Sequence, residues 1–314
     1  MEIVSAPFKG RSLLTWKDWS PQEIETLLEL SLCVKAQAHN GDIQQRFLGK
    51  TIALIFEKRS TRTRCAFETA FGEEGGHPVF LSLQDIQLGG KESVQDTARV
   101  LGRMFNAIEF RGFKQQHVEE LASFSGIPVI NGLTDEYHPT QALADIMTLK
   151  EQFGALQGLH ICFCGDGRNN VARSLMLICA KLGINFSVYA PRELFPDNAI
   201  QTLCKPFAAA SGAKITISDE KSVVKNADCL YTDVWVSMGE ESLKTERTKL
   251  LASYQVNESL MSATGKSSTI FMHCLPAVKG QEVTESVFES AQSVVFDEAE
   301  NRKHTIKAIL LSVL

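Results

Sequence analysis

Phe56-Glu57-Lys58-Arg59-Ser60-Thr61-Arg62-Thr63-Arg64 is the stretch in which a predicted strand turns into a predicted helix. The preceding run, Thr51 to Phe56, reads TIALIF, and such a β-branched, apolar run is typical of a buried strand. The following run, Cys65 to Phe71, has apolar residues at helical spacing until Gly75-Gly76 ends the pattern. Because a helix N-terminus presents unpaired backbone N–H groups and a partial positive charge, the junction predicts an anion-binding site.

The side chains of this junction favour the same interpretation. Ser60, Thr61 and Thr63 can each donate a short O–H hydrogen bond to an anion. Arg62 adds a planar fork that matches the geometry of a phosphate group. A Ser60 N-cap followed by a solvated basic turn is the simpler alternative. Further polar clusters at predicted strand ends favour the anion site over that alternative.

The bulk composition excludes several classes of protein. With 314 residues the chain is long enough for two domains, and its 44% hydrophobic and 22% charged residues are typical of a soluble globular protein. The net charge of −5 gives nucleic-acid binding no driving force, and no apolar run is long enough to span a bilayer. No secretory signal is visible, and the eight scattered cysteines form no secreted disulfide framework. We therefore expect a cytoplasmic protein without a nucleic-acid or membrane partner.

Short apolar runs alternate with helical patterns along the chain. The predicted strands are Ile52–Phe56, Val79–Leu81, Ala107–Phe110, Val129–Ile130, Leu159–Phe163, Phe186–Tyr189, Lys214–Ile217, Cys229–Thr232, Thr269–Met272 and Ser293–Phe296. The predicted helices are 20–39, Cys65–Phe71, Val94–Met104, Gln115–Phe124, Thr140–Phe153, Asn170–Leu182, Asp197–Ala210 and Glu298–Leu310. This alternation predicts an α/β fold with two doubly wound parallel sheets and with ligands at the carboxyl ends of the strands.

A domain boundary is expected near residues 153–158, because a new strand starts directly after this glycine-containing segment. The predicted domains are therefore residues 1–150 and 151–296. The last helix, at about 297–314, is expected to pack back on the first domain.

Other candidate residues of the first domain lie in loops or at strand ends. Gln87 and Lys91 belong to a glycine-containing loop, in which a lysine is usually only solvated. Arg111 directly follows a predicted strand, and a surface ion pair is the alternative role for it. His138-Pro139-Thr140-Gln141 opens a helix, where His138 could donate to a carbonyl oxygen or simply cap the helix.

The second domain carries amide groups after its first predicted strand. The segment from Gly165 to Asn170 lacks the G-x-G-x-x-G spacing of a dinucleotide fingerprint, so a nicotinamide enzyme is the weaker alternative. Asn169 and Asn170 instead offer neutral amides that suit a zwitterionic amino acid. Cys162-x-Cys164 lacks a second pair of metal ligands, and we interpret it as core packing and not as a zinc site.

Two later strand ends add charged and nucleophilic groups. Asp233, which precedes Ser237-Met238-Gly239, is placed to hold an ammonium group. Cys274 follows His273, but neighbours in a strand point to opposite faces, so His273 is not expected to act as its base. Arg302 adds one more guanidinium group before the apolar end of the last helix.

Together these motifs resemble the carbamoyltransferases, and within them the ornithine branch. The resemblance extends from about Gly10 to the C-terminus and rests on Ser60-Thr61-Arg62-Thr63-Arg64, Phe110-Arg111-Gly112, His138-Pro139-Thr140-Gln141, Asp233 with Ser237-Met238-Gly239, and His273-Cys274-Leu275-Pro276. The first and third motifs mark the carbamoyl phosphate half that the whole family shares. Aspartate carbamoyltransferases carry a proline-containing loop in place of Cys274, whereas His-Cys-Leu-Pro together with Ser-Met-Gly is similar to the ornithine branch.

The resemblance implies transfer of the carbamoyl group from carbamoyl phosphate to the side-chain amine of L-ornithine, in a cleft between the two domains. The residues implied for carbamoyl phosphate are Ser60, Thr61, Arg62, Thr63, Gln87, Lys91, Arg111, His138, Pro139, Thr140, Gln141, Cys274, Leu275 and Arg302. Those implied for ornithine are Asn170, Asp233, Ser237 and Met238, and those implied for catalysis are Arg111, His138, Asp233 and Cys274. The family pattern implies no metal ion and no organic cofactor.

The resemblance also implies a trimer in arginine metabolism, with Gln87 and Lys91 reaching into the active site of a neighbouring subunit. Two positions depart from the family pattern: Gly90 stands where many relatives have a larger residue, and Arg173 stands where a smaller or neutral one is common. The alternatives that stay open are a carbamoyltransferase for another amine, such as putrescine or an acylated ornithine, and a catalytically silent member. The direction of the reaction in the cell and any assembly beyond a trimer are also open.

Overall fold

The computed structural model describes residues 6–42, 44–86, 92–236 and 239–314. The chain divides into two compact units, one formed by Met1–Met147 with Glu300–Leu314 and the other by Thr148–Ala299. Both divisions fall inside helices, namely α5 (Pro139–Phe153) and α11 (Val295–Val313). Residues 300–313 of the last helix, and Leu314 after it, therefore belong to the first unit.

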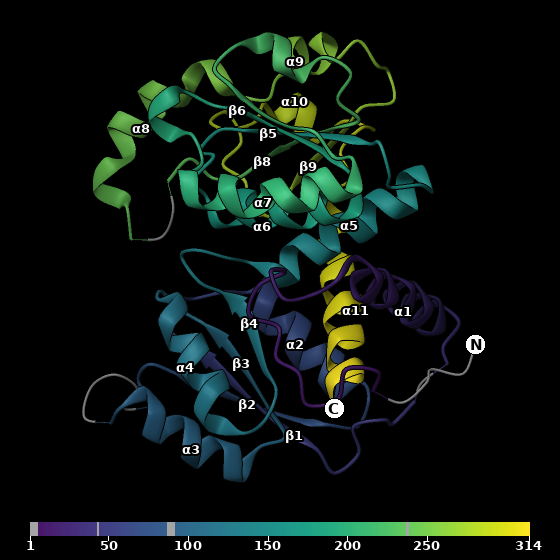
Figure 1. The fold of residues 1–314 in the computed structure, drawn as a ribbon, viewed down its shortest axis with the longest axis vertical. Coiled ribbons are helices and arrows are strands. Elements are labelled where there is room, and N and C mark those ends of the chain that lie inside the picture. The colour runs from purple at the N-terminus through teal and green to yellow at the C-terminus, as the bar shows by residue number, and fades with distance from the viewer. Residues whose placement is uncertain (1–5, 43, 87–91, 237–238) are drawn as a thin grey trace. The chain divides into compact units, whose positions relative to one another are not determined.

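The first unit is built on a four-stranded parallel sheet with the strand order β2-β1-β3-β4. Its strands are β1 (Thr51–Phe56), β2 (His77–Ser82), β3 (Ala107–Arg111) and β4 (Val129–Leu133). Its further helices are α1 (Pro21–His39), α2 (Arg62–Gly72), α3 (Val94–Met104) and α4 (Gln115–Ser125). In Figure 1, α3 and α4 lie on one face of this sheet, and α2 lies on the other.

Burial follows the alternation of side chains along the strands. Ile55 of β1 and Ile108 and Phe110 of β3 pack against α3 and α4 in one core cluster. Since successive strand residues point to opposite faces, Glu109 and Arg111 of β3 lie on the face away from α3 and α4. The apolar alternation therefore directs these two charged side chains to the face that α2 covers.

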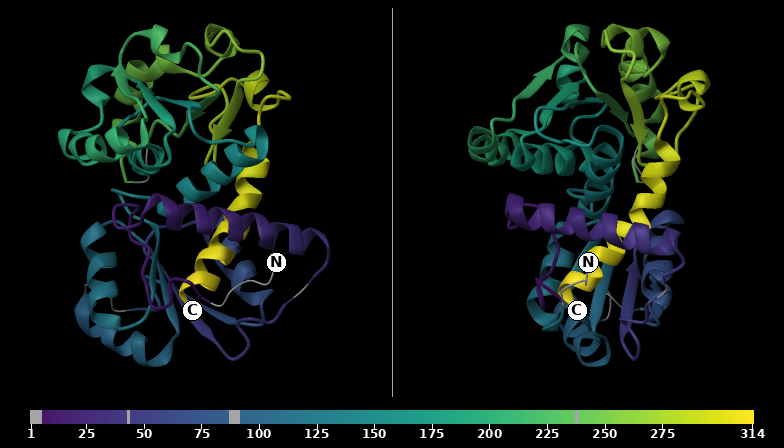
Figure 2. Two further views of the ribbon diagram at one scale, coloured as in Figure 1. Left: turned by 45° about the vertical axis from the view of Figure 1, so that its right-hand side comes forward. Right: turned by 90° about the vertical axis from the view of Figure 1, so that its right-hand side faces the viewer.

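The C-terminal helix joins the first unit along α1. Figure 2 shows α1 beside α11, and the ammonium group of Lys35 on α1 donates to Asn301 Oδ1 at 2.8 Å. Near the end of α11, Phe8 N donates to Ser312 O at 2.8 Å. Within residues 6–42, 44–86, 92–236 and 239–314, no helix combines the length and the apolar character needed to cross a membrane.

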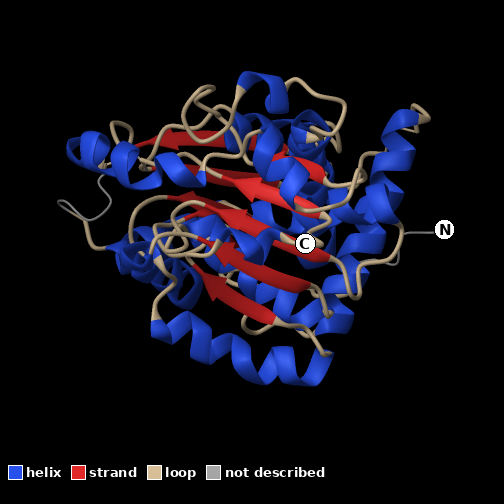
Figure 3. Cartoon of the chain, turned by 90° about the horizontal axis from the view of Figure 1, so that it is seen from above, coloured by secondary structure: helices blue, strands red, loops and turns tan. Residues whose placement is uncertain are grey.

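The second unit is built on a five-stranded parallel sheet with the strand order β7-β6-β5-β8-β9. Its strands are β5 (His160–Cys164), β6 (Asn185–Tyr189), β7 (Ile215–Ser218), β8 (Cys229–Thr232) and β9 (Ile270–His273). Its helices are α6 (Asn170–Leu182), α7 (Asn198–Ser211), α8 (Lys244–Leu251), α9 (Glu258–Ala263) and α10 (Glu285–Phe288), with short 3-10 turns between them. Within each sheet the strand arrows point the same way (Figure 3).

Cys162 and Cys164 are buried in a core cluster with residues of α9 and α10, as expected for packing residues. Arg173 lies within α6 and forms an ion pair with Asp197, the N-cap of α7. The helix predicted after Asn170 is therefore present.

The predicted α/β fold with two parallel sheets is confirmed, but the predicted strand Ser293–Phe296 is wrong. Ser293 forms only an isolated bridge with Phe271, and α11 already begins at Val295. The carbonyl of Val294 accepts from Glu298 N at 2.9 Å, which is a helical bond. The short apolar run Val294 to Phe296 does not distinguish a strand from the start of a helix, and only the packing decides between them.

Candidate active site

The polar residues of the first unit meet at the edge where its parallel strands end. Residues 57–61 lead from β1 into α2, Arg111 is the last residue of β3, and residues 134–138 lead from β4 into α5. Ser60 Oγ accepts a hydrogen bond from Thr63 N at 3.1 Å, so this hydroxyl caps the first turn of α2. The N-terminus of α2 and the guanidinium-bearing end of β3 therefore lie at one edge of the sheet.

A buried hydrogen-bond network converges on Thr63. Its hydroxyl oxygen accepts from Arg111 Nη1 and from Arg302 Nη2, each at 3.3 Å. Arg302 also donates from Nη1 to Gln141 Oε1 at 2.6 Å and from Nη2 to Thr140 Oγ1 at 3.3 Å. Arg302 is only 2% exposed, and Arg111 is buried as well. The structure thus brings together five residues that the sequence resemblance assigned to carbamoyl phosphate.

His138 is a buried, uncharged imidazole beside this network. Its Nδ1 lies 3.4 Å from Thr140 Oγ1. Burial, followed by the positive charges of Arg302 and Arg111, holds the pKa of His138 well below its ordinary value of 6.5. A neutral imidazole keeps one N–H, so it can donate a hydrogen bond to a substrate oxygen at neutral pH. The backbone carbonyl of His138 accepts from Gln141 N at 3.2 Å, so the main chain of this residue takes part in capping α5.

Glu109 is a second buried acid–base group, and the sequence interpretation missed it. Its side chain is 0% exposed, and neither carboxyl oxygen has a hydrogen-bond partner among the described residues. Burial raises its pKa well above the ordinary value of 4.5, although Arg111 and Arg302 attract the charged form. Because a protonated carboxyl group carries no charge, Glu109 in that form does not neutralise the positive charges of Arg111 and Arg302. The only signal in the sequence is an acid inside the apolar strand AIEFR.

Two buried guanidinium groups beside a helix N-terminus are suited to bind a phosphate-containing anion, because both supply directed N–H donors and positive charge. Arg62 is the first residue of α2 and is half-buried. On the more exposed side of the same loop, Ser60 and Thr61 line a surface pocket of about 490 Å³ together with Phe80 of β2.

The second unit places another polar cluster at the carboxyl ends of β5, β8 and β9. Asp233 Oδ2 accepts from Asn169 Nδ2 at 2.8 Å, and Asp233 Oδ1 accepts from the Cys274 thiol at 3.1 Å. Asn169 Oδ1 also accepts from Val171 N at 2.7 Å, which makes Asn169 the N-cap of α6. Asn170, which the resemblance assigned to ornithine, is the next residue and the first of α6.

His273 is fully buried and is held by partners other than the thiol. Its Nε2 lies 3.2 Å from Glu282 Oε1, and its Nδ1 accepts from Leu275 N at 2.9 Å. The thiol of Cys274 instead donates to Asp233. Asp233 therefore orients the thiol through this hydrogen bond.

The remaining candidates have different positions. Pro139 begins α5, and its carbonyl accepts from Trp16 Nε1 at 3.1 Å. Leu275 is half-buried and packs against the core of the second unit. The candidates Gln87, Lys91, Ser237 and Met238 lie outside the described residues.

Comparisons with known proteins bear on both units. The aspartate/ornithine carbamoyltransferase carbamoyl-P binding domain matches residues 11–151, and the Asp/Orn binding domain of the same family matches residues 157–313. The chain belongs to the aspartate/ornithine carbamoyltransferase family. By sequence, Arg302 falls in the second of these carbamoyltransferase domains, although its side chain contacts Thr63 and Gln141 of the first.

Individual members of the family are similar over nearly the whole chain. The ornithine carbamoyltransferase of Caldanaerobacter subterraneus subsp. tengcongensis is 61% identical, with 98% of each chain covered. The ornithine carbamoyltransferase of Thermotoga maritima is 59% identical over 99% of this chain and 100% of that protein. The solved structure of ornithine carbamoyltransferase from Pyrococcus furiosus has a TM-score of 0.95 at 44% identity and covers 99% of this chain and 98% of that one.

Proposed function

We propose that this protein transfers the carbamoyl group of carbamoyl phosphate to the side-chain amine of L-ornithine, giving L-citrulline and phosphate. The observation that carries the proposal is the meeting of Arg111 and Arg302 on Thr63, at the N-terminus of α2. The similar proteins named ornithine carbamoyltransferase support ornithine as the acceptor.

In this proposal, the first unit binds carbamoyl phosphate and stabilises the charge that develops during the reaction. Ser60, Thr61 and Arg62 would hold the phosphate, because a helix N-terminus with hydroxyl and guanidinium donors suits that group. Arg111 and His138, with the Thr63 hydroxyl, would donate to the carbonyl oxygen. One such donor to a developing oxyanion contributes on the order of 3 kcal/mol to transition-state stabilisation.

Gln141 and Arg302 would complete the carbamoyl end of the site. The carboxamide oxygen of Gln141 accepts from Arg302 at 2.6 Å, and its amide nitrogen donates to Asp145 Oδ1 at 2.8 Å. Both contacts fix the orientation of the Gln141 amide, which in this proposal recognises the amide of the substrate.

The second unit would hold the amino acid. Asp233 supplies a carboxylate for an ammonium group, and Asn169 and Cys274 orient that carboxylate through the hydrogen bonds described above. The side-chain amine of ornithine is an alkyl amine, with an ordinary pKa of about 10. It must therefore lose a proton before it attacks at neutral pH. The amine lone pair then forms the new C–N bond, the C–O bond to phosphate breaks, and phosphate leaves with that electron pair and takes up the surplus amine proton.

We also propose that the protein acts as a cytoplasmic trimer in arginine metabolism, with Gln87 and Lys91 contributing to a neighbouring subunit's site. The support for this part is the resemblance to the carbamoyltransferases described above. Sedimentation velocity tests this part: a trimer is the expected result, and a monomer at working concentrations would contradict it.

The decisive experiment measures product formation from carbamoyl phosphate with ornithine, putrescine, lysine, N-acetylornithine and aspartate as separate acceptors. Citrulline from ornithine, without comparable product from the other amines, is the expected result. Product from another amine alone would show that the acceptor is wrong, and no product from any amine would show that transfer itself is wrong.

A matched pair of variants tests the phosphate contacts. Arg62→Ala is expected to abolish turnover by weakening carbamoyl phosphate binding. Arg99→Ala, which changes an exposed arginine of α3, should keep both turnover and carbamoyl phosphate binding. Calorimetry with carbamoyl phosphate measures the binding. An Arg62→Ala variant that bound carbamoyl phosphate as well as the parent would contradict the assignment.

A further inference from the structure

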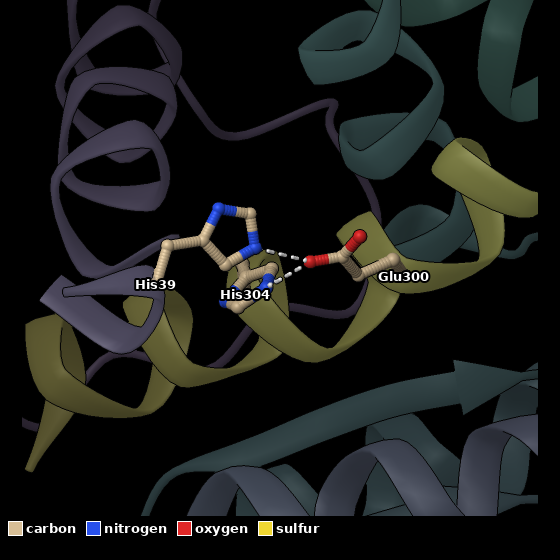
Figure 4. Close-up of side chains that lie close together, drawn as sticks. All are labelled: His39, Glu300 and His304. Atoms are coloured by element: carbon tan, nitrogen blue, oxygen red, sulfur yellow. Dashed lines mark hydrogen bonds and ion pairs between the residues drawn. The ribbon is translucent and has the colours of Figure 1, made fainter. Parts of the chain in front are cut away.

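Three side chains that commonly bind metal ions meet where α1 ends against α11. His39 Nε2 lies 2.8 Å from Glu300 Oε1, and His304 Nε2 lies 3.1 Å from the same oxygen. One ligand atom from each residue lies within 4.8 Å of the other two. Figure 4 shows both imidazole rings directed at the Glu300 carboxylate.

The helices place these groups together for a simple geometric reason. Glu300 and His304 are four residues apart in α11, so they share one face of that helix. His39 is the last residue of α1, and the nearby contact between Lys35 and Asn301 holds this end of α1 against α11. The cluster therefore comes from two helices that are fixed to each other.

Arg302 lies two residues from both Glu300 and His304 in α11 and points away from their face, since residues two apart do not share a helix face. Its contacts with Thr63 and Gln141 belong to the network described above. The histidine cluster is thus separate from the carbamoyl phosphate residues, although one helix carries both.

We propose that His39, Glu300 and His304 bind a divalent transition-metal ion, with Zn²⁺ as the expected occupant. Two imidazole nitrogens and one carboxylate oxygen are donors that suit Zn²⁺, whereas Mg²⁺ and Ca²⁺ prefer oxygen ligands alone. Metal–ligand bonds of about 2.0–2.1 Å place tetrahedral ligand atoms about 3.3 Å apart. The two nitrogen–oxygen separations of 2.8 and 3.1 Å need to open only slightly, and the two imidazole nitrogens lie within 4.8 Å of each other.

The surroundings of the cluster favour a three-ligand site with one open position. The His304 side chain is only 1% exposed, whereas the Glu300 side chain is 41% exposed, so the cluster lies at the surface with one ligand on its buried side. The His39 side chain is 60% exposed, which leaves room for a water molecule as the fourth ligand. The two neighbouring ammonium groups have other contacts: Lys35 with Asn301, and Lys303 with Glu73.

A metal ion here would link the last turn of α1 to α11. Because the ion binds the folded arrangement and not a chain in which the two helices are apart, it should raise the resistance of the first unit to unfolding. The alternative is a metal-free network of hydrogen bonds and ion pairs among the same three side chains.

The test uses the full chain with Cys274→Ser as the background, because Asp233, His273 and Cys274 form the other cluster of possible ligands among the described residues. His39→Ala in this background removes an exposed ligand with little effect on packing. The matched control is His77→Ala, which changes an exposed histidine at the start of β2. Calorimetry with Zn²⁺ alone gives stoichiometry and affinity, and thermal unfolding with and without Zn²⁺ gives the change in Tm.

The background and the His77→Ala control are expected to bind one Zn²⁺ per chain and to show a higher Tm with the ion. His39→Ala should weaken binding at least about tenfold and abolish the rise in Tm. Glu300→Gln should also weaken Zn²⁺ binding and reduce the rise in Tm. Equal Zn²⁺ affinity in His39→Ala and its control, or no binding to the background chain, would overturn the proposal and leave the ion-pair network.

Discussion

Glu109→Gln removes a titrating proton from the interior while keeping the size of the side chain. The carboxyl group has no exposed surface, and neither of its oxygens has a hydrogen-bond partner within the described part of the chain. A Cβ at Gly132 would lie only 1.9 Å from Glu109 Oε1, so the carboxyl group is packed directly against that backbone. An amide of the same shape can occupy this space, but it cannot ionise.

The change in stability with pH that we expect for Glu109 follows from the direction of its pKa shift. Burial raises the pKa of Glu109 in the folded protein well above 4.5, although Arg111 and Arg302 favour the carboxylate. The folded state therefore binds this proton more tightly than the unfolded state. The stabilising contribution is complete below pH 4.5 and is lost as the pH rises towards the folded pKa. Within that window the loss is about 1.4 kcal/mol per pH unit.

The Glu109→Gln variant has no carboxyl group at this position and does not lose this stability. The free energy of unfolding of the variant, minus that of the parent, should therefore increase with pH across the window. Equilibrium urea unfolding at several values between about pH 5 and pH 8 measures the difference, and groups common to both proteins cancel in it. Glu29→Gln, which makes the same replacement at an exposed residue of α1, is the matched control. A constant difference for Glu109→Gln, or one that falls with pH, would show that the carboxyl group is ionised and paired with the guanidinium groups.

Three further predictions concern single contacts. Arg302→Lys removes the planar fork that bonds Gln141 and Thr63, and it should lower kcat/KM at least about tenfold, because one lost charged hydrogen bond costs about 1.5–3 kcal/mol; steady-state kinetics measure this. Cys274→Ser should raise the KM for ornithine more than the KM for carbamoyl phosphate. Unchanged ornithine kinetics would show that the thiol is not part of the ornithine site. Gly102→Ala should destabilise the protein by about 1–3 kcal/mol in urea unfolding, because the new Cβ would lie 1.9 Å from Ser125 O. Gly72→Ala, whose Cβ meets nothing within 4 Å, is its control and should cost little.

Much of the secondary structure followed from local signals in the sequence. Val94–Met104 was predicted with the bounds that α3 has, because Ser93 caps it and its apolar residues recur at helical spacing. At the start of α1, within the helix predicted over residues 20–39, Ser20 and Glu23 form a capping box. By contrast, α8, α9 and α10 were not predicted, because a helix of eight residues or fewer contains too few turns to show a clear periodicity.

The sequence by itself also identified most of the candidate residues of both polar clusters. Parallel strands end at a common edge, so residues after different strands could be expected to meet there. Sequence could not show which atoms touch. It did not pair Asn169 with Asp233, and it passed over Glu109, because a strand pattern does not reveal whether a buried acid finds a partner.

Only the tertiary structure decided the contacts between residues that are far apart in the chain. Arg302 reaches Thr63 across 239 residues, and Glu300 reaches His39 across 261. Such pairs leave no periodic or spacing signal, because they depend on the packing of α11 against the first unit. The free energy that holds them comes from burying the apolar face of that helix, and the polar contacts form where this packing places them.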